Sequence, residues 1–301
     1  MLMKFICFKK SDREKLGVIS RDGTLAIELS SIKLSKEFYD MNDLIKNISN
    51  SDIERIQNIL FDNNTMSVTT YPIHEIKLCS PIKRPTHDII CVGVNYQDHL
   101  DEIKENFDKE SFDEPKKTVY FSKRATETIG PDDIIVSHVN IDNQLDYEVE
   151  LAVIIGSKGV NISKEKAEDY IFGYTIMNDI SARNLQQQHM QWYRGKSLDT
   201  FTALGPSIVH KSEIPFPVKL NIRSRVNGEL RQNSNTEYFL ANIPSIIAEI
   251  SNGITLEPGD IIATGTPSGV GIGFKPPRFI KAGDIVECEI QDIGILRNRV
   301  R

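Results

Sequence analysis

The stretch from Asp146 to Leu151 opens an apolar run and places two carboxylates one residue apart. Successive side chains of a strand point to opposite faces, so Glu148 and Glu150 emerge on one face while Val149 points the other way. The apolar run continues to Ile155, which is typical of a largely buried strand. Any fold that contains this strand must therefore place two like charges where a hydrophobic core begins.

Two carboxylates about 4 Å apart repel by about 4 kcal/mol at an effective dielectric constant near 20, so they must separate, take up a proton or share a cation. An isolated Glu-x-Glu is ordinarily explained by an edge strand with both side chains in water. A third acid favours the cation, because Asp179 ends the apolar segment 172–179, where a buried strand gives way to a polar turn. Three oxygen ligands without Cys or His suit a hard ion, so we predict a Mg²⁺ or Mn²⁺ site at Glu148, Glu150 and Asp179.

The composition is that of an ordinary globular protein. The chain has 301 residues, of which 40% are hydrophobic and 26% charged, enough for one large domain or a large one and a small one. A net charge of -6, with basic runs no longer than Lys-Lys pairs, disfavours a nucleic-acid partner. No stretch approaches the roughly 18 apolar residues of a membrane span, and the apolar part of residues 1–10 is too short for a signal peptide.

The cysteines indicate a reducing compartment. They are widely scattered and show no Cys-x-x-Cys spacing, so neither a structural zinc site nor a disulfide framework is indicated. We therefore expect a cytoplasmic protein without a membrane partner. The four residues are Cys7, Cys79, Cys91 and Cys288.

Residues 1–82 are predicted to form a small N-terminal α+β domain. A first strand lies within residues 1–10, and Asp22-Gly23 is a hairpin signal between two further short strands, because Asp-Gly supplies the positive dihedrals of a tight turn. Helices are expected near 42–48 and 51–60, followed by a polar break at 62–65. We place the domain boundary near Pro81 to Pro85.

Residues 83–301 are predicted to form a β-rich body with peripheral helices, because short apolar strands alternate there with Gly, Pro, Asn and Asp. Helices are expected at 163–171, with Ser163 as N-cap, and at 243–251, with Asn242 as N-cap and an apolar stripe facing the core. Leu204-Gly205-Pro206 is interpreted as a breaker. Residues 101–117 are poor in apolar side chains, and we expect this segment to be mobile.

His99 and Glu102 form a candidate acid–base pair just after the apolar strand 89–94. Three residues apart on one helical turn, they face the same way, so Glu102 can hold the imidazole in one tautomer and raise its basicity. A His–Glu pair at this spacing is also common on a solvated helix face, and the spacing alone does not separate the two.

Several polar residues are candidates for substrate contact, although each type is most often found at the surface. Lys196 follows a glycine in a turn, and Arg183 and Gln186 follow Asp179 at a spacing that lets both face a substrate carboxylate. The Gly-rich loop 264–273 lacks the Lys-Ser or Lys-Thr and the helix of a phosphate loop. We expect it to bring backbone amides and threonine hydroxyls against a ligand.

Taken together, these motifs resemble the fumarylacetoacetate hydrolase family over residues 85–301. The stretches that carry the resemblance are Asn95-Tyr96-x-Asp98-His99, Asp146-Tyr147-Glu148-Val149-Glu150, Gly173-Tyr174-Thr175-x-x-Asn178-Asp179-Ile180-Ser181-Ala182-Arg183, Gly195-Lys196-Ser197 and the run 256–271.

The resemblance implies a fold and a set of site residues. The fold is an α+β, β-rich one: a mixed β-sandwich roll, usually a homodimer, here with a small N-terminal domain. The metal ligands implied are Glu148, Glu150 and Asp179, and the catalytic residues are His99 and Glu102, on a lid, and Lys196. The residues implied around the substrate are Lys123, Arg183, Gln186, Thr264, Gly265 and Thr266.

Two departures from the family narrow the expected substrate. The fumarylacetoacetate hydrolase that gives the family its name has a larger N-terminal domain and a differently placed histidine. The chain is more similar to acylpyruvate hydrolases, oxaloacetate decarboxylases and the isomerases and decarboxylases of bacterial aromatic degradation. The segment 190–193 is shorter than in acylpyruvate hydrolases, which affects the fit of a distal substrate group.

The resulting hypothesis is an enzyme that cleaves a C–C bond of a small 2-oxo acid through a metal-bound enolate, as an oxaloacetate decarboxylase or an acylpyruvate hydrolase. The cations near the triad slightly favour dianionic oxaloacetate. One alternative is an isomerase, hydratase or decarboxylase of 2-hydroxy-dienoates, because the same site can move a proton without cleaving carbon. Another is a non-catalytic binding protein that has kept the fold.

Overall fold

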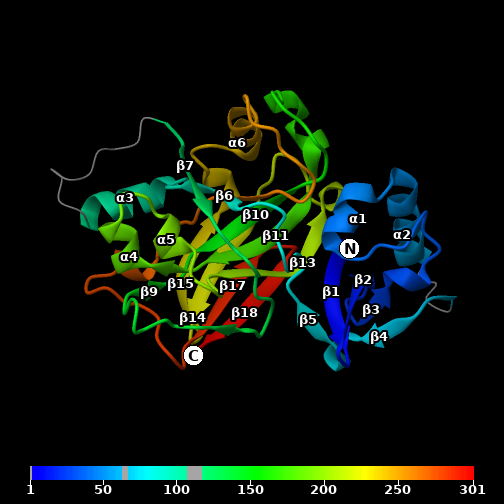
Figure 1. Ribbon diagram of the computed structural model, residues 1–301, viewed down its shortest axis with the longest axis horizontal. Coiled ribbons are helices and arrows are strands. Elements are labelled where there is room, and N and C mark those ends of the chain that lie inside the picture. Colours follow the sequence, from blue (N-terminus) through cyan, green and yellow to red (C-terminus); the bar gives the residue numbers. More distant parts are fainter. Residues whose placement is uncertain (1, 63–66, 107–116) are drawn as a thin grey trace.

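The computed structural model describes residues 2–62, 67–106 and 117–301, and the fold is β-rich with mixed sheets (Figure 1). Most of the segment expected to be mobile, 107–116, and most of the expected polar break lie outside the described residues. No helix in the described part of the chain is long and apolar enough to cross a membrane.

An 11-stranded sheet runs through the whole molecule in the order β4-β3-β2-β1-β13-β11-β10-β16-β6-β7, and β5 also pairs with β1. Neighbouring strands are antiparallel except for β16 and β6, which are parallel. The bounds are β1 Lys4–Lys10, β2 Arg13–Ile19, β3 Leu25–Glu28, β4 Thr70–Pro72, β5 Lys77–Cys79, β6 Ile89–Gly93, β7 Val119–Lys123, β10 Val149–Ile155, β11 Ile171–Asp179, β13 Thr202–His210 and β16 Ile261–Ala263.

The N-terminal unit contains the expected hairpin and two helices, α1 Met41–Asn47 and α2 Asn50–Asp62. Gly23 has φ +78°, as the turn between β2 and β3 requires. The strands of this unit extend the large sheet, because β1 pairs with β13 and places Phe5 opposite Ile208. In Figure 1 the unit is blue to cyan and stands beside β13. A domain boundary near residue 82 stays a prediction.

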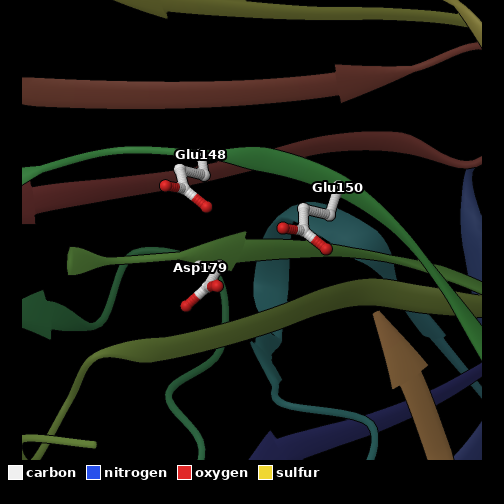
Figure 2. Close-up of side chains that lie close together, drawn as sticks. All are labelled: Glu148, Glu150 and Asp179. Atoms are coloured by element: carbon white, nitrogen blue, oxygen red, sulfur yellow. The ribbon is translucent and has the colours of Figure 1, made fainter. Parts of the chain in front are cut away.

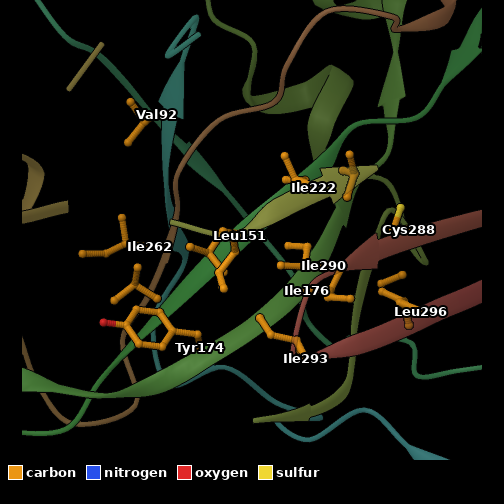
Figure 3. Close-up of a cluster of buried hydrophobic side chains, with 14 of the residues drawn as sticks. Val92, Leu151, Tyr174, Ile176, Ile222, Ile262, Cys288, Ile290, Ile293 and Leu296 are labelled. Atoms are coloured by element: carbon orange, nitrogen blue, oxygen red, sulfur yellow. The ribbon is translucent and has the colours of Figure 1, made fainter. Parts of the chain in front are cut away.

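A second sheet, of five strands, packs against β10 and β11 in the order β15-β14-β17-β18-β8. Leu151 and Ile176 from the large sheet meet Ile222, Ile290 and Leu296 from the second sheet in the main core (Figure 3). This layering is the mixed β-roll predicted for the body. The bounds are β8 Ile134–Ile135, β14 Asn221–Val226, β15 Glu229–Asn235, β17 Ile285–Ile290 and β18 Gly294–Val300, and a separate pair is formed by β9 Leu145–Asp146 and β12 Ser181–Ala182.

The other helices lie at the periphery and include α3 Gln97–Asn106, α4 Arg183–Gln188, α5 Tyr193–Lys196 and α6 Ile243–Ile250. Asn242 caps α6 by accepting a hydrogen bond from the Ser245 amide, as predicted. The helix expected at 163–171 is instead a 3₁₀ helix over Lys164–Tyr170, and the Ser163 side chain makes no capping hydrogen bond.

Leu204-Gly205-Pro206 was wrongly interpreted as a breaker, because it lies inside β13. The pairing of β11 with β13 shifts register between Tyr174 and Ile176, opposite this tripeptide. Gly205 has φ +136°, and a proline without an amide hydrogen is tolerated where the ladder is irregular.

Candidate active site

Glu148, Glu150 and Asp179 converge because β10 and β11 are antiparallel neighbours. The register places Glu150 opposite Met177, so Asp179, two residues further along, lies opposite Glu148. Its amide donates to the Glu148 carbonyl at 2.9 Å. One oxygen from each carboxylate lies within 4.8 Å of the other two, and Figure 2 shows the three groups turned toward one another. The alternative of an edge strand in water is wrong, since all three side chains are buried.

Lys196 holds two of these carboxylates together. Its ammonium group donates to Glu148 Oε2 at 2.7 Å and to Asp179 Oδ2 at 2.8 Å, and the side chain is 2% exposed. Burial opposes the charge on Lys196, but Asp179 and Glu148 outweigh it and raise its pKa. The lysine therefore stays charged and supplies a fixed cation beside the triad.

Lys123 lies on the other side of Asp179, to which its ammonium donates at 2.6 Å. It also donates to the Ile180 carbonyl at 3.1 Å and to the Lys196 carbonyl. Burial lowers the pKa of Lys123 even though Asp179 opposes this shift. Three acceptors around a fully buried ammonium group account for its position in the protein interior.

Arg183 joins the triad to Asp146, a residue for which the sequence predicted no role. Its Nε donates to Asp146 Oδ2 at 2.8 Å, and its Nη1 lies 2.7 Å from Glu148 Oε1 and 2.9 Å from Gln186 Oε1. Asp146 also accepts the amides of Gly271 and Ile272 at 2.6 and 2.9 Å. Its position two residues before Glu148, in the same acidic stretch, was the only available signal.

The charge balance of the site leaves one carboxylate uncompensated. Asp146, Glu148, Glu150 and Asp179 face the three cations, and among the described residues none of these cations pairs with Glu150. Burial first, then Asp179 and Glu148, raise the pKa of Glu150 well above its ordinary value. In contrast, Lys196 and Arg183 overcome burial and lower the pKa of Glu148. A hard divalent cation would remove the imbalance at Glu150, so the residues present fit such an ion.

His99 and Glu102 form the predicted pair on the first turns of α3. His99 Nδ1 lies 2.9 Å from Glu102 Oε2, and both side chains are largely buried. The helix is held against the Gly-rich loop, because Ser268 Oγ donates to Asp98 at 2.9 Å and the Gly269 amide donates to Glu102 Oε1 at 2.9 Å. The pair therefore does not lie on a solvated face.

The loop of Thr264, Gly265 and Thr266 lies against β10. The Gly265 amide donates to Glu150 Oε2 at 2.8 Å, and the two threonine hydroxyls donate to the carbonyls of Leu151 and Val149 at 2.8 and 2.9 Å. These groups thus hold the strand that carries the triad, and their contact with a substrate stays a prediction. All the residues predicted for the site lie around the triad or on α3.

Two clefts open elsewhere on the described surface. One of about 830 Å³ lies on the N-terminal unit against residues 13–16, 28–42 and 81–84, and no triad residue lines it. A smaller one, of about 360 Å³, reaches Asn95 and Leu100 at the start of α3. The triad carboxylates line neither of these clefts and are buried.

The sequence matches the model of the fumarylacetoacetate hydrolase C-terminal domain over residues 88–301. The chain belongs to the fumarylacetoacetate hydrolase family, as its motifs predicted.

Some of the proteins to which the chain is similar have names that state a reaction. The chain is 48% identical over 238 residues to oxaloacetate tautomerase YisK of Bacillus subtilis, covering 79% of this chain and 77% of that one. It is 39% identical over 308 residues to the mitochondrial oxaloacetate tautomerase fahd2 of Xenopus laevis, covering 99% and 90%. Among solved structures, a fumarylacetoacetate hydrolase from Exiguobacterium antarcticum matches with a TM-score of 0.80 at 35% identity, over 99% of both chains.

Proposed function

We propose that this protein is a divalent-metal-dependent enzyme that interconverts the keto and enol forms of a small 2-oxo dicarboxylate of the oxaloacetate type. The observation that carries the proposal is the convergence of Glu148, Glu150 and Asp179 within 4.8 Å, to which α3 adds the His99–Glu102 pair. The names of the two relatives above support oxaloacetate over other 2-oxo acids.

Mg²⁺ or Mn²⁺ is the cofactor we propose, held by Glu148, Glu150 and Asp179. When bound, it would supply positive charge that stabilises the 2-oxo oxygen as this oxygen gains negative charge. The protein's part is to fix the ligands: Lys196 bridges Glu148 and Asp179, and the Gly265 amide orients Glu150. These contacts reduce the freedom of all three carboxylates before any ion arrives.

His99 is the group we propose for proton transfer. Glu102 occupies Nδ1 and so fixes the tautomer in which Nε2 is free to accept a proton. In this scheme Nε2 takes the C3 proton of the keto form and a proton is returned to the 2-oxo oxygen, so that no atom is gained or lost. Glu102 is then a positioning residue, because it acts through the imidazole.

The charges of the site suit a dianionic substrate. With a divalent ion bound and all four carboxylates ionised, the three cations and the ion would give the site one net positive charge. Lys123, Lys196 and Arg183 are each engaged with a carboxylate, so they act by balancing the ligand set. Direct contact of these three residues or of Gln186 with substrate stays a prediction.

C–C bond cleavage, the reaction favoured from the sequence, is a second candidate. The same imidazole could take a proton from water for attack on an acylpyruvate, and loss of carbon dioxide from oxaloacetate would give the same type of enolate. The names of the two relatives favour tautomerisation over cleavage. A diene isomerase remains the runner-up class.

One assay with two readouts separates these reactions. Purified protein with Mn²⁺ is given oxaloacetate, and the ultraviolet absorbance of the enol is followed while pyruvate is measured by a coupled enzyme. A tautomerase accelerates the keto–enol relaxation without forming pyruvate. Pyruvate formed at the same rate as the absorbance change would instead identify a decarboxylase.

Homodimer formation and a cytoplasmic location also stay predictions, and light scattering on the purified protein tests homodimer formation.

A further inference from the structure

The peptide groups between the two metal-site glutamates lack a neighbouring strand on one side. On the side away from β11, β10 pairs with β16 only through Ala152 to Ile154. Beyond Ala263 the chain turns away through Gly265, which has φ +93°. The N–H and C=O of Val149 therefore need partners that the sheet does not supply.

Two side chains from distant elements fill this gap. The Val149 amide donates to Gln232 Oε1 at 3.1 Å, and Thr266 Oγ1 donates to the Val149 carbonyl at 2.9 Å. Gln232 Nε2 donates to Thr266 Oγ1 at 2.7 Å, so the three residues close a ring of hydrogen bonds. Both Gln232 and Thr266 are buried.

Gln232 is saturated in one orientation of its amide group. Oε1 accepts the Val149 amide and the Ser224 hydroxyl, and Nε2 donates to Thr266 Oγ1 and to the Pro267 carbonyl at 2.8 Å. A flipped amide would direct its NH₂ group at the Val149 N–H and lose these bonds. A fully buried glutamine with this many partners is therefore rigid, and its position is determined by the second sheet, to which it belongs.

We propose that Gln232 is a positioning residue for the metal centre, which rests on the proposed function. The Val149 N–H belongs to the peptide plane shared with Glu148, and its C=O belongs to the plane shared with Glu150. The Gln232–Thr266 ring thus fixes both planes and, through them, the directions in which the two carboxylates leave the strand. Hard cations such as Mg²⁺ tolerate little deviation in ligand geometry, so loosening these planes weakens binding.

The test compares the Mn²⁺ affinity of Gln232→Met with that of the wild type, by calorimetry after removal of metal with chelator. Methionine keeps the length of the side chain but offers no amide, and we expect a loss of affinity of about 10-fold to 100-fold, as is usual for residues that support metal ligands. Ser224→Ala is the matched control. It removes another buried hydrogen bond of the same glutamine but leaves the ring intact, so its affinity should stay within about 3-fold of the wild-type value.

The outcomes are separable from those that test the proposed function. No Mn²⁺ binding by the wild-type protein would overturn the proposed metal site itself. Wild-type affinity in Gln232→Met, or an equal loss in Ser224→Ala, would overturn only the role of Gln232. If Gln232→Met fails to fold, Thr266→Val removes the other arm of the ring from a different element. Thr266→Val should show the same loss, and unchanged affinity there would contradict the proposal.

Discussion

Glu148 and Asp179 lie opposite each other on β10 and β11 and share the ammonium group of Lys196, at 2.7 and 2.8 Å. The shared lysine compensates these two carboxylates and leaves Glu150, on the same face of the same strand, with the Gly265 amide as its hydrogen-bond partner. The site is therefore asymmetric, with two compensated carboxylates and a third whose pKa is raised by burial and by its neighbours.

Replacing Glu150 with Gln should have opposite effects on metal binding and on stability. We expect Mn²⁺ affinity to fall by about 100-fold or more, since losing a ligand costs more than losing a supporting residue. The metal-free protein should gain about 1 kcal/mol of unfolding free energy, because a buried carboxyl group whose ionisation is strongly disfavoured is removed. Calorimetry and urea unfolding measure the two quantities. Glu54→Gln, at an exposed position of α2, should change neither.

Replacing Lys196 with Met should destabilise the metal-free protein by about 3–5 kcal/mol, because two buried carboxylates lose their common cation. Mn²⁺ should restore part of the lost melting temperature, since it provides positive charge at the same place. Lys158→Met is the control, because Lys158 pairs with Glu257 at the surface and such pairs contribute about 0–1 kcal/mol. Equal destabilisation in the two variants would argue against a bridging role for Lys196.

Loss of the imidazole should affect the reaction but not metal binding. His99→Gln is expected to lower kcat for oxaloacetate tautomerisation by about 10²–10⁴-fold, the usual contribution of a general acid–base group. Glu102→Gln should lower kcat less, and both variants should bind Mn²⁺ normally. Gln97→Ala, on the exposed face of α3, serves as the control. A wild-type kcat in His99→Gln would contradict the proposed role of His99 as the base.

Acid should weaken the junction between the N-terminal unit and the body through His210. Burial, together with Lys211, lowers the pKa of His210 to about 4, and the His210 amide donates to the Met3 carbonyl at 3.0 Å. The folded-state pKa lies below the unfolded value of about 6.5, so neutral His210 contributes its full share of the unfolding free energy above pH 6.5. This share is lost as the pH falls toward 4, because the unfolded chain takes up the proton first.

The corresponding measurement is urea unfolding at pH 7.5 and pH 5. Between these values the wild type should lose about 2 kcal/mol more unfolding free energy than His210→Asn, which keeps an acceptor for the Ser212 amide. Parallel losses in the two proteins would show that His210 does not titrate in this way.

The sequence predicted that Glu148 and Glu150 lie on one face, because strand alternation alone places them there. The position of Asp179 was inferred from where its strand ends, and the register of β10 on β11 brings it opposite Glu148. The His99–Glu102 spacing likewise predicted a contact that depends only on one helical turn.

Contacts between distant parts of the chain could not be predicted in this way. Gln232 lies 83 residues from Val149 and within a polar run that resembles a loop, yet it belongs to β15 and faces the large sheet. The tripeptide Leu204-Gly205-Pro206 was misread for the same reason, since only its pairing with β11 shows that the strand continues through it.

The most direct test of the central claim is a crystal structure of the protein with Mn²⁺, examined by anomalous scattering. We expect one strong peak enclosed by Glu148, Glu150 and Asp179, with carboxylate oxygens at about 2.0–2.3 Å. A peak elsewhere, or none at these carboxylates at saturating Mn²⁺, would contradict the account.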